Sequence, residues 1–384
     1  MRIVILGSAY PFRGGLAIYN ERLAQELTRL GHTVRIYTFT VQYPRWLFPG
    51  KTQFRTGPPP EGIAIYRRVH AFGPLSWWQT AQELRKWNPE LALAKFWLPV
   101  MGISLGSTLK LLPPPTVRLT ILDNVIPHEK RVGDKFFIRY FISAVDGAIA
   151  MSRAVAKDWQ LFTQKPLLQL FHPLYDHYGE ALPKVEACET LGLDPQYRYL
   201  LFFGLIRAYK GLDLLLEAWR SDELRKFTDT KLLIAGELYE PYEKYQPYLE
   251  APEMQGRVIF HEGFVPEEKV RYYFCAADAI VQPYRTATQS GITQIAYHFE
   301  KPMIVTNVGG LPEMVPAGEV GFVCEPTTVA LIESIRKFLS TPSHTFKSAL
   351  QEQKKRYSWE SFARALLEFT ANLNRYPSRW FGGS

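Results

Sequence analysis

The sequence predicts an α/β fold with two successive domains, each built around a doubly wound parallel sheet. Its 384 residues are too many for one domain of average size. Short apolar runs alternate with amphipathic helical patterns through both halves of the chain, which is typical of parallel sheets. A polar stretch at 174–196 interrupts this alternation and is expected to be a linker. With 47% hydrophobic and 21% charged residues, the composition is that of a globular protein and argues against disorder.

The first forty residues predict a complete βαβ unit. Residues 2–7 form a short apolar run that ends in glycine, as a buried parallel strand does. A glycine-containing loop leads to residues 16–30, where leucines recur at helical spacing. Another glycine ends this helix, and residues 33–38 are rich in β-branched and aromatic side chains, which predicts the next strand. A right-handed crossover within a parallel sheet follows from this order.

The rest of the first half continues the alternation with two interruptions. Further strands are expected at 63–69, 91–97, 117–122 and 147–151. Residues 42–61 hold a proline cluster, which predicts a loop, and residues 72–88 hold three tryptophans. Long loops in compact α/β domains are usually binding loops or lids.

The second half begins a new set of α/β elements after the expected linker. Strands are expected at 197–204, 231–236, 257–263, 279–284 and 302–308, and helices at 212–219, 266–276, 290–299 and 359–373. We therefore expect an N-terminal domain at 1–183, a second domain at 184–358 and a final segment at 359–384. The default ligand site of such a chain is a central cleft that both domains face.

Cysteine and hydropathy patterns exclude several classes of protein. The three cysteines (Cys188, Cys275 and Cys324) are odd in number and widely spaced, which excludes a disulfide framework and a CxxC metal knuckle. No apolar run approaches the ~20 residues that span a bilayer, and the apolar start is too short for a signal peptide. We therefore expect a cytoplasmic protein, soluble or peripheral at the inner face of the membrane.

The net charge of +8 is distributed unevenly. Residues 1–183 carry 22 Lys and Arg against 12 Asp and Glu, whereas residues 184–350 carry 17 against 22. The basic half suits an anionic lipid surface, a polyanionic substrate or a nucleic acid, and composition alone does not choose among them. No recognisable nucleic-acid-binding module accompanies the charge, so we expect no nucleic acid partner.

Three loops between a strand and a helix are candidate anion sites. Gly14 and Gly15 precede the first helix, although the dinucleotide fingerprint GxGxxG is absent, which counts against an NAD(P) enzyme. Arg207 and Lys210 follow the first strand of the second domain, where a cation pair beside a glycine suits a diphosphate. Each pattern equally suits an ordinary turn or two solvated surface cations.

The third candidate loop leads into the helix expected at 290–299. Thr288 or Ser290 can cap that helix, and the backbone N–H groups near Gly291, Ile292 and Thr293 would then point toward an anion. Simple helix capping and anion binding share this geometry, so the two interpretations do not exclude each other.

Ordered motifs along the chain carry a resemblance to a known family. These motifs are Gly14-Gly15, Phe203-Gly204 with Arg207 and Lys210-Gly211, Gly236-Glu237, Gly263-Phe-Val-Pro266, Lys301-Pro302 and Val308-Gly-Gly-Leu-Pro-Glu313. In this order and spacing, the chain resembles the bacterial-type retaining family-four nucleotide-sugar glycosyltransferases, which have the GT-B fold. The resemblance covers nearly the whole chain, and it implies two Rossmann-like domains facing a central cleft, with the last helix crossing back to the first domain.

The resemblance implies roles for individual residues. Arg207 and Lys210 match the cations that hold the donor diphosphate and steady the leaving group. The remaining donor-binding positions are expected at Gly14, Gly15, Phe264, Val265, Thr288, Gln289, Ser290, Gly291, Ile292, Thr293 and Gln294. The family needs no metal or other cofactor, its co-substrate being a nucleotide-diphosphate sugar, and we expect neither here.

The chain departs from the family pattern at two places. The family usually has two glutamates eight positions apart at the strand–helix corner of the second domain, but here Glu300 is the only acid between Pro283 and Lys301. The functional histidine of the first domain is also displaced: Asp123 occupies the nearest matching place, and His128 lies five residues further on. We expect either residue to contact the sugar or the acceptor.

These observations predict a retaining glycosyltransferase of the hexosyltransferase type, acting in polysaccharide biosynthesis. It would move a sugar from a nucleotide diphosphate to a hydroxyl of a glycan or lipid-linked acceptor, with an anionic membrane surface as a further partner. The missing acidic pair leaves two alternatives open, which are a non-catalytic nucleotide-sugar-binding protein and a GT-B-like nucleotide-sugar epimerase.

Overall fold

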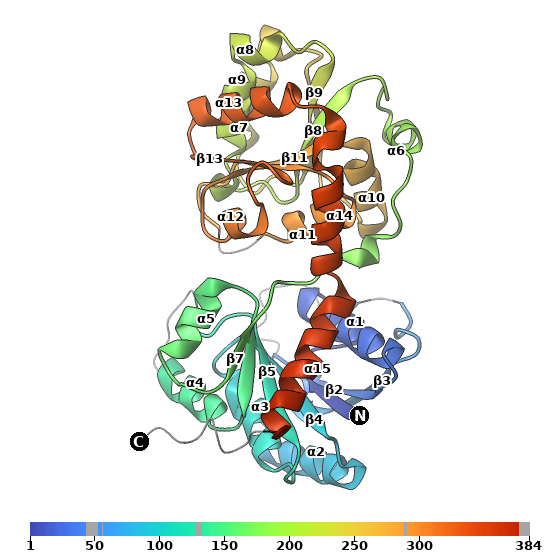
Figure 1. Ribbon diagram of the computed structural model, residues 1–384, viewed down its shortest axis with the longest axis vertical. Coiled ribbons are helices and arrows are strands. Elements are labelled where there is room, and N and C mark those ends of the chain that lie inside the picture. The colour runs from blue at the N-terminus through green and yellow to red at the C-terminus, as the bar shows by residue number, and fades with distance from the viewer. Residues whose placement is uncertain (44–52, 56, 128–132, 288–289, 376–384) are drawn as a thin grey trace. The chain divides into compact units, whose positions relative to one another are not determined.

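A computed structural model describes residues 1–43, 53–55, 57–127, 133–287 and 290–375 (Figure 1). The chain forms two compact units. Met1–His172 and the segment that starts at Trp359 make up unit 1, and Pro173–Ser358 make up unit 2. The domain boundary expected at 183/184 therefore lies inside unit 2, ten residues or so beyond the point where the contacts divide. Within the described residues, none of the helices is long and apolar enough to cross a bilayer.

Unit 1 contains a seven-stranded sheet of order β3-β2-β1-β4-β5-β6-β7, in which all neighbours pair in parallel. The strands are β1 Arg2–Leu6, β2 Thr33–Val41, β3 Ala64–His70, β4 Leu91–Phe96, β5 Val117–Leu122, β6 Gly147–Ala150 and β7 Leu167–Gln169. The order reverses between β1 and β4, which is the doubly wound pattern predicted from the sequence. Only β7 has no counterpart among the expected strands.

Helices cover both faces of this sheet: α1 Gly15–Arg29, α2 Pro74–Trp87, α3 Met101–Lys110, α4 Asp134–Ile142, α5 Arg153–Gln160 and α15 Trp359–Arg375. Strand β4 shows why two layers are needed, because its side chains alternate between two separate cores. Leu91 and Leu93 pack with α1 and α15 in one core, and Ala92, Ala94 and Phe96 pack in the other.

The last helix belongs to unit 1. Trp359 and Leu366 of α15 are buried in the same core as Tyr19 of α1, and the rings of Tyr19 and Trp359 lie 5.0 Å apart. An ion pair of 2.6 Å between Arg29 and Glu360 joins the two helices at the surface.

Unit 2 contains a six-stranded parallel sheet of order β10-β9-β8-β11-β12-β13. Its strands are β8 Arg198–Phe203, β9 Thr230–Gly236, β10 Val258–Glu262, β11 Ala279–Gln282, β12 Met303–Thr306 and β13 Gly321–Cys324. Its α-helices are α6 Lys184–Leu191, α7 Leu212–Trp219, α8 Asp222–Arg225, α9 Gln246–Leu249, α10 Glu267–Ala276, α11 Gly291–His298, α12 Leu311–Met314, α13 Thr328–Leu339 and α14 Lys347–Arg356. Short 3-10 turns are η2 Asp176–Tyr178, η3 Ala208–Lys210, η4 Tyr242–Lys244, η5 Pro252–Met254 and η6 Ser343–Phe346.

Two predictions about the elements are wrong. The expected linker at 174–196 contains helix α6, of which only Ala187 and Cys188 are buried, so it carries too few apolar positions to show a helical period. The tryptophan-rich stretch at 72–88 is helix α2, which begins at Pro74 and buries Leu84 in the core. Proline at the first helical position starts this helix rather than breaking it.

Candidate functional site

The candidate site of unit 2 lies where the strand order of its sheet reverses. Strand β8 runs between β9 and β11, and the loops after β8 and β11 meet at their carboxyl ends. Two glycines allow this approach. A Cβ atom on Gly236 would lie 2.0 Å from the carbonyl oxygen of Gly204, and one on Gly211 would lie 2.1 Å from that of Pro283. The switch point of an open α/β sheet is where such folds bind ligands.

Lys210 is the buried cation of this site. Lys210 is the last residue of η3 and is only 8% exposed. Its Nζ lies close to Gly204, 3.0 Å from the position that a Cβ on that glycine would occupy. Ile292 of α11 lies against the same position, so the loop after β8 and the start of α11 come together. Lys210 makes no hydrogen bond or ion pair with any residue that the structure describes. Burial, helped by the nearby charge of Arg207, lowers the pKa of Lys210 to about 8.

Arg207 is held in a different way. The backbone around it pairs with the segment after β9, because Ile206 donates to the carbonyl of Glu237 and Tyr239 donates back to that of Ile206. The guanidinium itself is exposed and lies 4.7 Å from the ring centroid of Tyr239. Arg207 is therefore positioned by a cation–π contact, and it forms no ion pair with a carboxylate in the described part of the chain.

An ion pair that sequence reasoning missed braces the same loop. Arg285 follows β11 and contacts both oxygens of Asp213 on α7, at 2.7 and 3.1 Å. Its backbone N–H donates to the carbonyl of Tyr209 at 2.7 Å. Burial tends to raise the pKa of Asp213, but the hydrogen bonds and charge of Arg285 outweigh it and the pKa is lowered. These contacts hold the loop that carries Lys210 against the end of β11.

The start of α11 supplies backbone N–H groups. Ser290 occupies the N-cap position, but its side chain makes no capping hydrogen bond and lies 3.4 Å from the hydroxyl of Tyr284 instead. The capping role expected for Ser290 is therefore wrong, and the first N–H groups of the helix keep no side-chain acceptor from that residue. Thr288 and Gln289 lie outside the described residues.

The next turn of α11 is polar but buried. Thr293 exchanges hydrogen bonds with Gln282 of β11, at 3.1 and 3.3 Å. Gln294 is 3% exposed, and its Oε1 has no hydrogen-bond partner within the described part of the chain. Glu300, the only acid of this corner, follows the far end of α11 and pairs with Lys354 at 3.0 Å. The structure therefore supplies neutral amides and hydroxyls where the family usually has glutamates.

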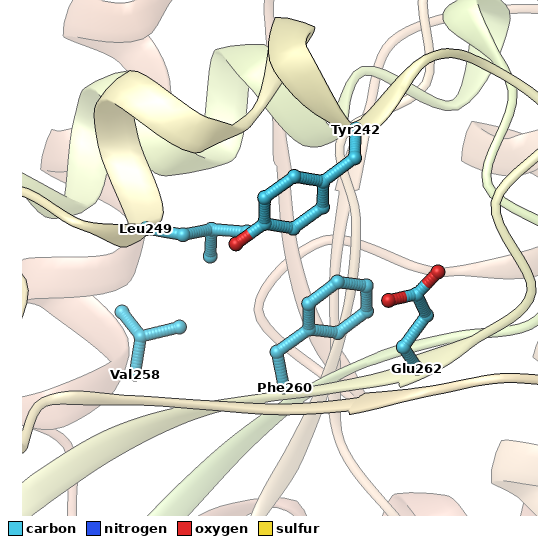
Figure 2. A pocket seen from close by; sticks show the side chains of 5 residues that line it. All are labelled: Tyr242, Leu249, Val258, Phe260 and Glu262. Carbon is cyan, nitrogen blue, oxygen red and sulfur yellow. The ribbon is translucent and has the colours of Figure 1, made fainter.

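The remaining donor-side prediction lies at the outer edge of the sheet. Phe264 and Val265 follow β10, which is two strands away from β8, and Phe264 is 70% exposed. A pocket of about 360 Å³ lies on one face of this edge strand, lined by Tyr242, Leu249, Val258, Phe260 and Glu262 (Figure 2). Its one charged group is the carboxylate of Glu262, so it offers nothing to attract a diphosphate.

Unit 1 holds the other predicted residues. Gly14 is the N-cap of α1 with a φ of 105°, a conformation that favours glycine, and Gly15 begins the helix. Asp123 directly follows β5, and its Oδ1 forms an ion pair of 2.6 Å with Nζ of Lys95 on β4. His128 lies outside the described residues. Lys95 was missed, although a lysine inside the apolar run Leu91–Phe96 is a visible signal.

Metal-binding residues do not gather in the described ranges, where no three His, Cys, Asp or Glu side chains lie close enough together to hold an ion.

The two sheets and the switch-point site define the class of protein. Two separate doubly wound parallel sheets in one chain are the architecture of GT-B glycosyltransferases. Residues 197–341 match the family described as Glycosyl transferases group 1. Residues 197–341 of unit 2 therefore form a group 1 glycosyltransferase domain, and the chain as a whole has the GT-B fold. The fold class and the enzyme class predicted from the sequence are both confirmed.

Similar proteins span nearly the whole chain. The putative teichuronic acid biosynthesis glycosyltransferase TuaC of Bacillus subtilis is 24% identical over 366 residues, covering 88% of this chain and 89% of TuaC. A glycosyltransferase from Rickettsia africae superposes with a TM-score of 0.70 at 16% identity, covering 97% of this chain and 98% of that one. The Anabaena protein HepE in complex with UDP superposes with a TM-score of 0.68 at 15% identity, covering 97% and 100%.

Proposed function

We propose that this glycosyltransferase moves a sugar from a nucleotide-diphosphate donor to a hydroxyl of a glycan or lipid-linked acceptor. One observation carries the proposal. Lys210 is a buried cation that has no counter-ion among the described residues, and it lies at the switch point of the sheet beside the start of α11. Burying an ammonium group is costly unless an anion accompanies it, so the site is built for an anionic ligand.

The chemistry of transfer explains why a diphosphate suits this site. The leaving group gains negative charge as the glycosidic bond breaks, and preorganised cations and N–H groups in a site of low dielectric stabilise that charge. Lys210 and the N–H groups of Gly291 and Ile292 supply this stabilisation from two sides. Arg207, more exposed, can reach the same group with a forked pair of donors. The UDP bound to HepE supports a nucleotide diphosphate as the ligand.

Retention of configuration and independence from metal are part of the proposal. The resemblance to the retaining family supports the first. Two cations in one loop support the second, because they can neutralise a diphosphate as a divalent ion would. The missing glutamates are replaced in our proposal by Gln294 and its neighbours, whose amides can bond sugar or ribose hydroxyls.

We infer from the exposed side chains of unit 1 that the protein associates peripherally with an anionic membrane, at the inner face of that membrane. Three large apolar side chains of unit 1 are exposed at the start of α2: Phe72, Leu75 and Trp78 are 46%, 66% and 51% exposed. Arg85 and Lys86 are exposed further along the helix. The single acid of α2, Glu83, is bonded to Arg68 and Tyr37. An aromatic end and a cationic end on one helix fit a bilayer surface with anionic headgroups.

A donor screen tests the proposed function. Thermal unfolding with UDP-, GDP- and ADP-sugars identifies the donor, and mass spectrometry of products with and without lipid or glycan acceptors identifies the reaction. Transfer is expected with one donor, and Arg207→Ala or Lys210→Ala should lower it by roughly 10²- to 10³-fold. Lys226→Ala, at an exposed site on the same unit, serves as the control.

Other outcomes point to the alternatives. Donor binding without transfer or hydrolysis would favour a non-catalytic binding protein, and an epimerised nucleotide sugar formed without acceptor would favour an epimerase. Stabilisation by no donor, or full activity in both variants, would overturn the proposal.

A further inference from the structure

Unit 1 contains a second buried lysine, and this one is paired. Lys95 lies near the carboxyl end of β4, a strand that is buried throughout, and its side chain is 2% exposed. Its Nζ lies 2.6 Å from Oδ1 of Asp123 and 3.5 Å from the ring centroid of Tyr19. The charge is therefore enclosed between α1, β4 and the end of β5.

Stability does not explain this pair. Removing a lysine from water is costly: burial lowers the pKa of Lys95, and the charge of Asp123 only partly offsets this. A buried ion pair is often no more stabilising than apolar side chains of similar volume. All the other residues of strand β4 are apolar and belong to the two cores. The lysine therefore has another use.

The base of the Lys95 side chain is closely packed. A Cβ on Gly7 would lie 3.2 Å from Cβ of Lys95 and 2.7 Å from Nδ2 of Asn20, so only glycine fits at position 7 beside them. Asn20 is itself fixed, because it donates to the carbonyl of Ser8 at 2.8 Å. The ammonium group lies between the ring of Tyr19 and the carboxylate of Asp123 at the end of β5.

Asp123 is the group that this arrangement fixes. Its backbone N–H donates to the carbonyl of Phe96 at 3.0 Å, which extends the pairing of β4 with β5 by one residue. One carboxylate oxygen faces Lys95, yet the side chain is still 24% exposed. Asp123 makes no other ion pair or side-chain hydrogen bond with residues in the described ranges. An oriented carboxylate with a solvent-accessible oxygen can accept a hydrogen bond from a sugar hydroxyl.

We propose that Lys95 is a positioning residue, which holds the carboxylate of Asp123 at the end of β5 so that its free oxygen accepts a hydrogen bond from a hydroxyl of the transferred sugar or the acceptor. This inference rests on the proposed function. Lys95 itself does not touch the substrate: it acts through Asp123. Because the cation sets the direction of the carboxylate, its loss displaces the acceptor atom rather than removing it.

A double-mutant cycle tests the inference. Lys95→Met, Asp123→Asn and the double variant are compared by kcat and KM of transfer with the donor found in the screen. A misplaced contact of this kind costs about 10²-fold, and we expect such a loss in kcat for each single variant. The double variant should be no slower than Asp123→Asn, because the lysine acts only through the carboxylate. The affinity for the nucleoside diphosphate alone, measured by calorimetry, should not change, since Arg207 and Lys210 are intact.

A second lysine controls for a merely structural role. Lys165, also in unit 1, donates to the carbonyls of Ile142 and Val145 at 2.8 and 2.6 Å and forms no ion pair with a carboxylate of the residues that the structure describes. Lys165→Met should lower the melting temperature and leave kcat unchanged. Lys95→Met should lower kcat and leave the melting temperature unchanged.

Three results overturn the inference: wild-type kcat in Lys95→Met, losses that multiply in the double variant, or a kcat loss in Lys95→Met that equals its loss of folded protein. No transfer by the unsubstituted protein with any donor would instead refute the proposed function, and the inference with it.

Discussion

Replacing Lys210 with methionine should stabilise the fold while it abolishes most of the activity. Burial and the charge of Arg207 lower the pKa of Lys210 from 10.5 to about 8 in the folded protein. The unfolded chain therefore binds one more proton than the folded chain between pH 8 and 10.5, and stability rises with pH over that window. At ~1.4 kcal/mol for each pH unit, the charged lysine costs the fold about 3 kcal/mol below pH 8. Lys210→Met removes that cost.

Urea unfolding at a series of pH values measures the effect. The free energy of unfolding of Lys210→Met should exceed that of the wild type by about 3 kcal/mol at pH 7, and the gap should close as the pH rises from 8 to 10.5. Transfer should fall by roughly 10²- to 10³-fold in the same variant. Lys226→Met, at an exposed position, should change neither quantity. A Lys210→Met protein that is less stable than the wild type at pH 7, or a gap independent of pH, would refute the reasoning.

The same pKa predicts how the ligand binds. A nucleoside diphosphate needs the ammonium form of Lys210, so its affinity for the wild type should decrease as the pH rises above 8, and calorimetry at pH 7 and 9.5 measures this. The bound anion raises the pKa again, so binding at pH 9 should be accompanied by proton uptake. Equal affinities at the two pH values, with no proton uptake, would place the anion elsewhere.

Three other predictions concern separate parts of the molecule. Gly236→Ala should cost about 1–3 kcal/mol in urea unfolding, because the new Cβ would lie 2.0 Å from a carbonyl oxygen, whereas Gly15→Ala, with open space around it, should cost far less. Trp78→Ser should weaken sedimentation with phosphatidylglycerol vesicles about tenfold, and Val329→Ser, at an even more exposed position on unit 2, should not. Transfer should continue in excess EDTA, and a loss restored by added Mg²⁺ or Mn²⁺ would refute metal independence.

Much of the fold could be predicted because the hydrophobic pattern of a parallel sheet is local. The strand at 117–122 was predicted at its observed bounds, since four of its six residues are apolar and every position except Arg118 is buried. Strand β7 was missed because it has only three residues. Strand β13, which has four residues, was also missed. Helix α2 was missed because tryptophans and a proline hid the helical spacing of Leu84 and its neighbours.

The site was predictable only where its groups are close in sequence. Arg207 and Lys210 stand three residues apart beside glycines, and the loop pattern alone indicated an anion site. The brace between Asp213 and Arg285 joins residues far apart in the chain, and no local spacing signals such a contact. For Ser290, local spacing was misleading. Its residue type and position predicted a helix cap, but its hydroxyl contacts the hydroxyl of Tyr284 instead of a backbone N–H of α11.

Lys95 and Lys210 both place a positive charge in the protein interior, but only Lys95 has a carboxylate partner among the described residues. This difference indicates the role of each lysine. Lys95 has a permanent carboxylate partner, so its charge is balanced whether or not a ligand is present, and the pair can hold a fixed geometry. Lys210 has no partner among the described residues, so its charge is balanced only when an anion arrives. A cation that binds and releases a ligand in every cycle cannot keep an internal counter-ion, because that ion would compete with the ligand. A buried cation that only orients a neighbouring residue, as we propose for Lys95, needs an internal counter-ion. The cost of about 3 kcal/mol at Lys210 is thus the stability given up for an anion site that is ready before its ligand binds.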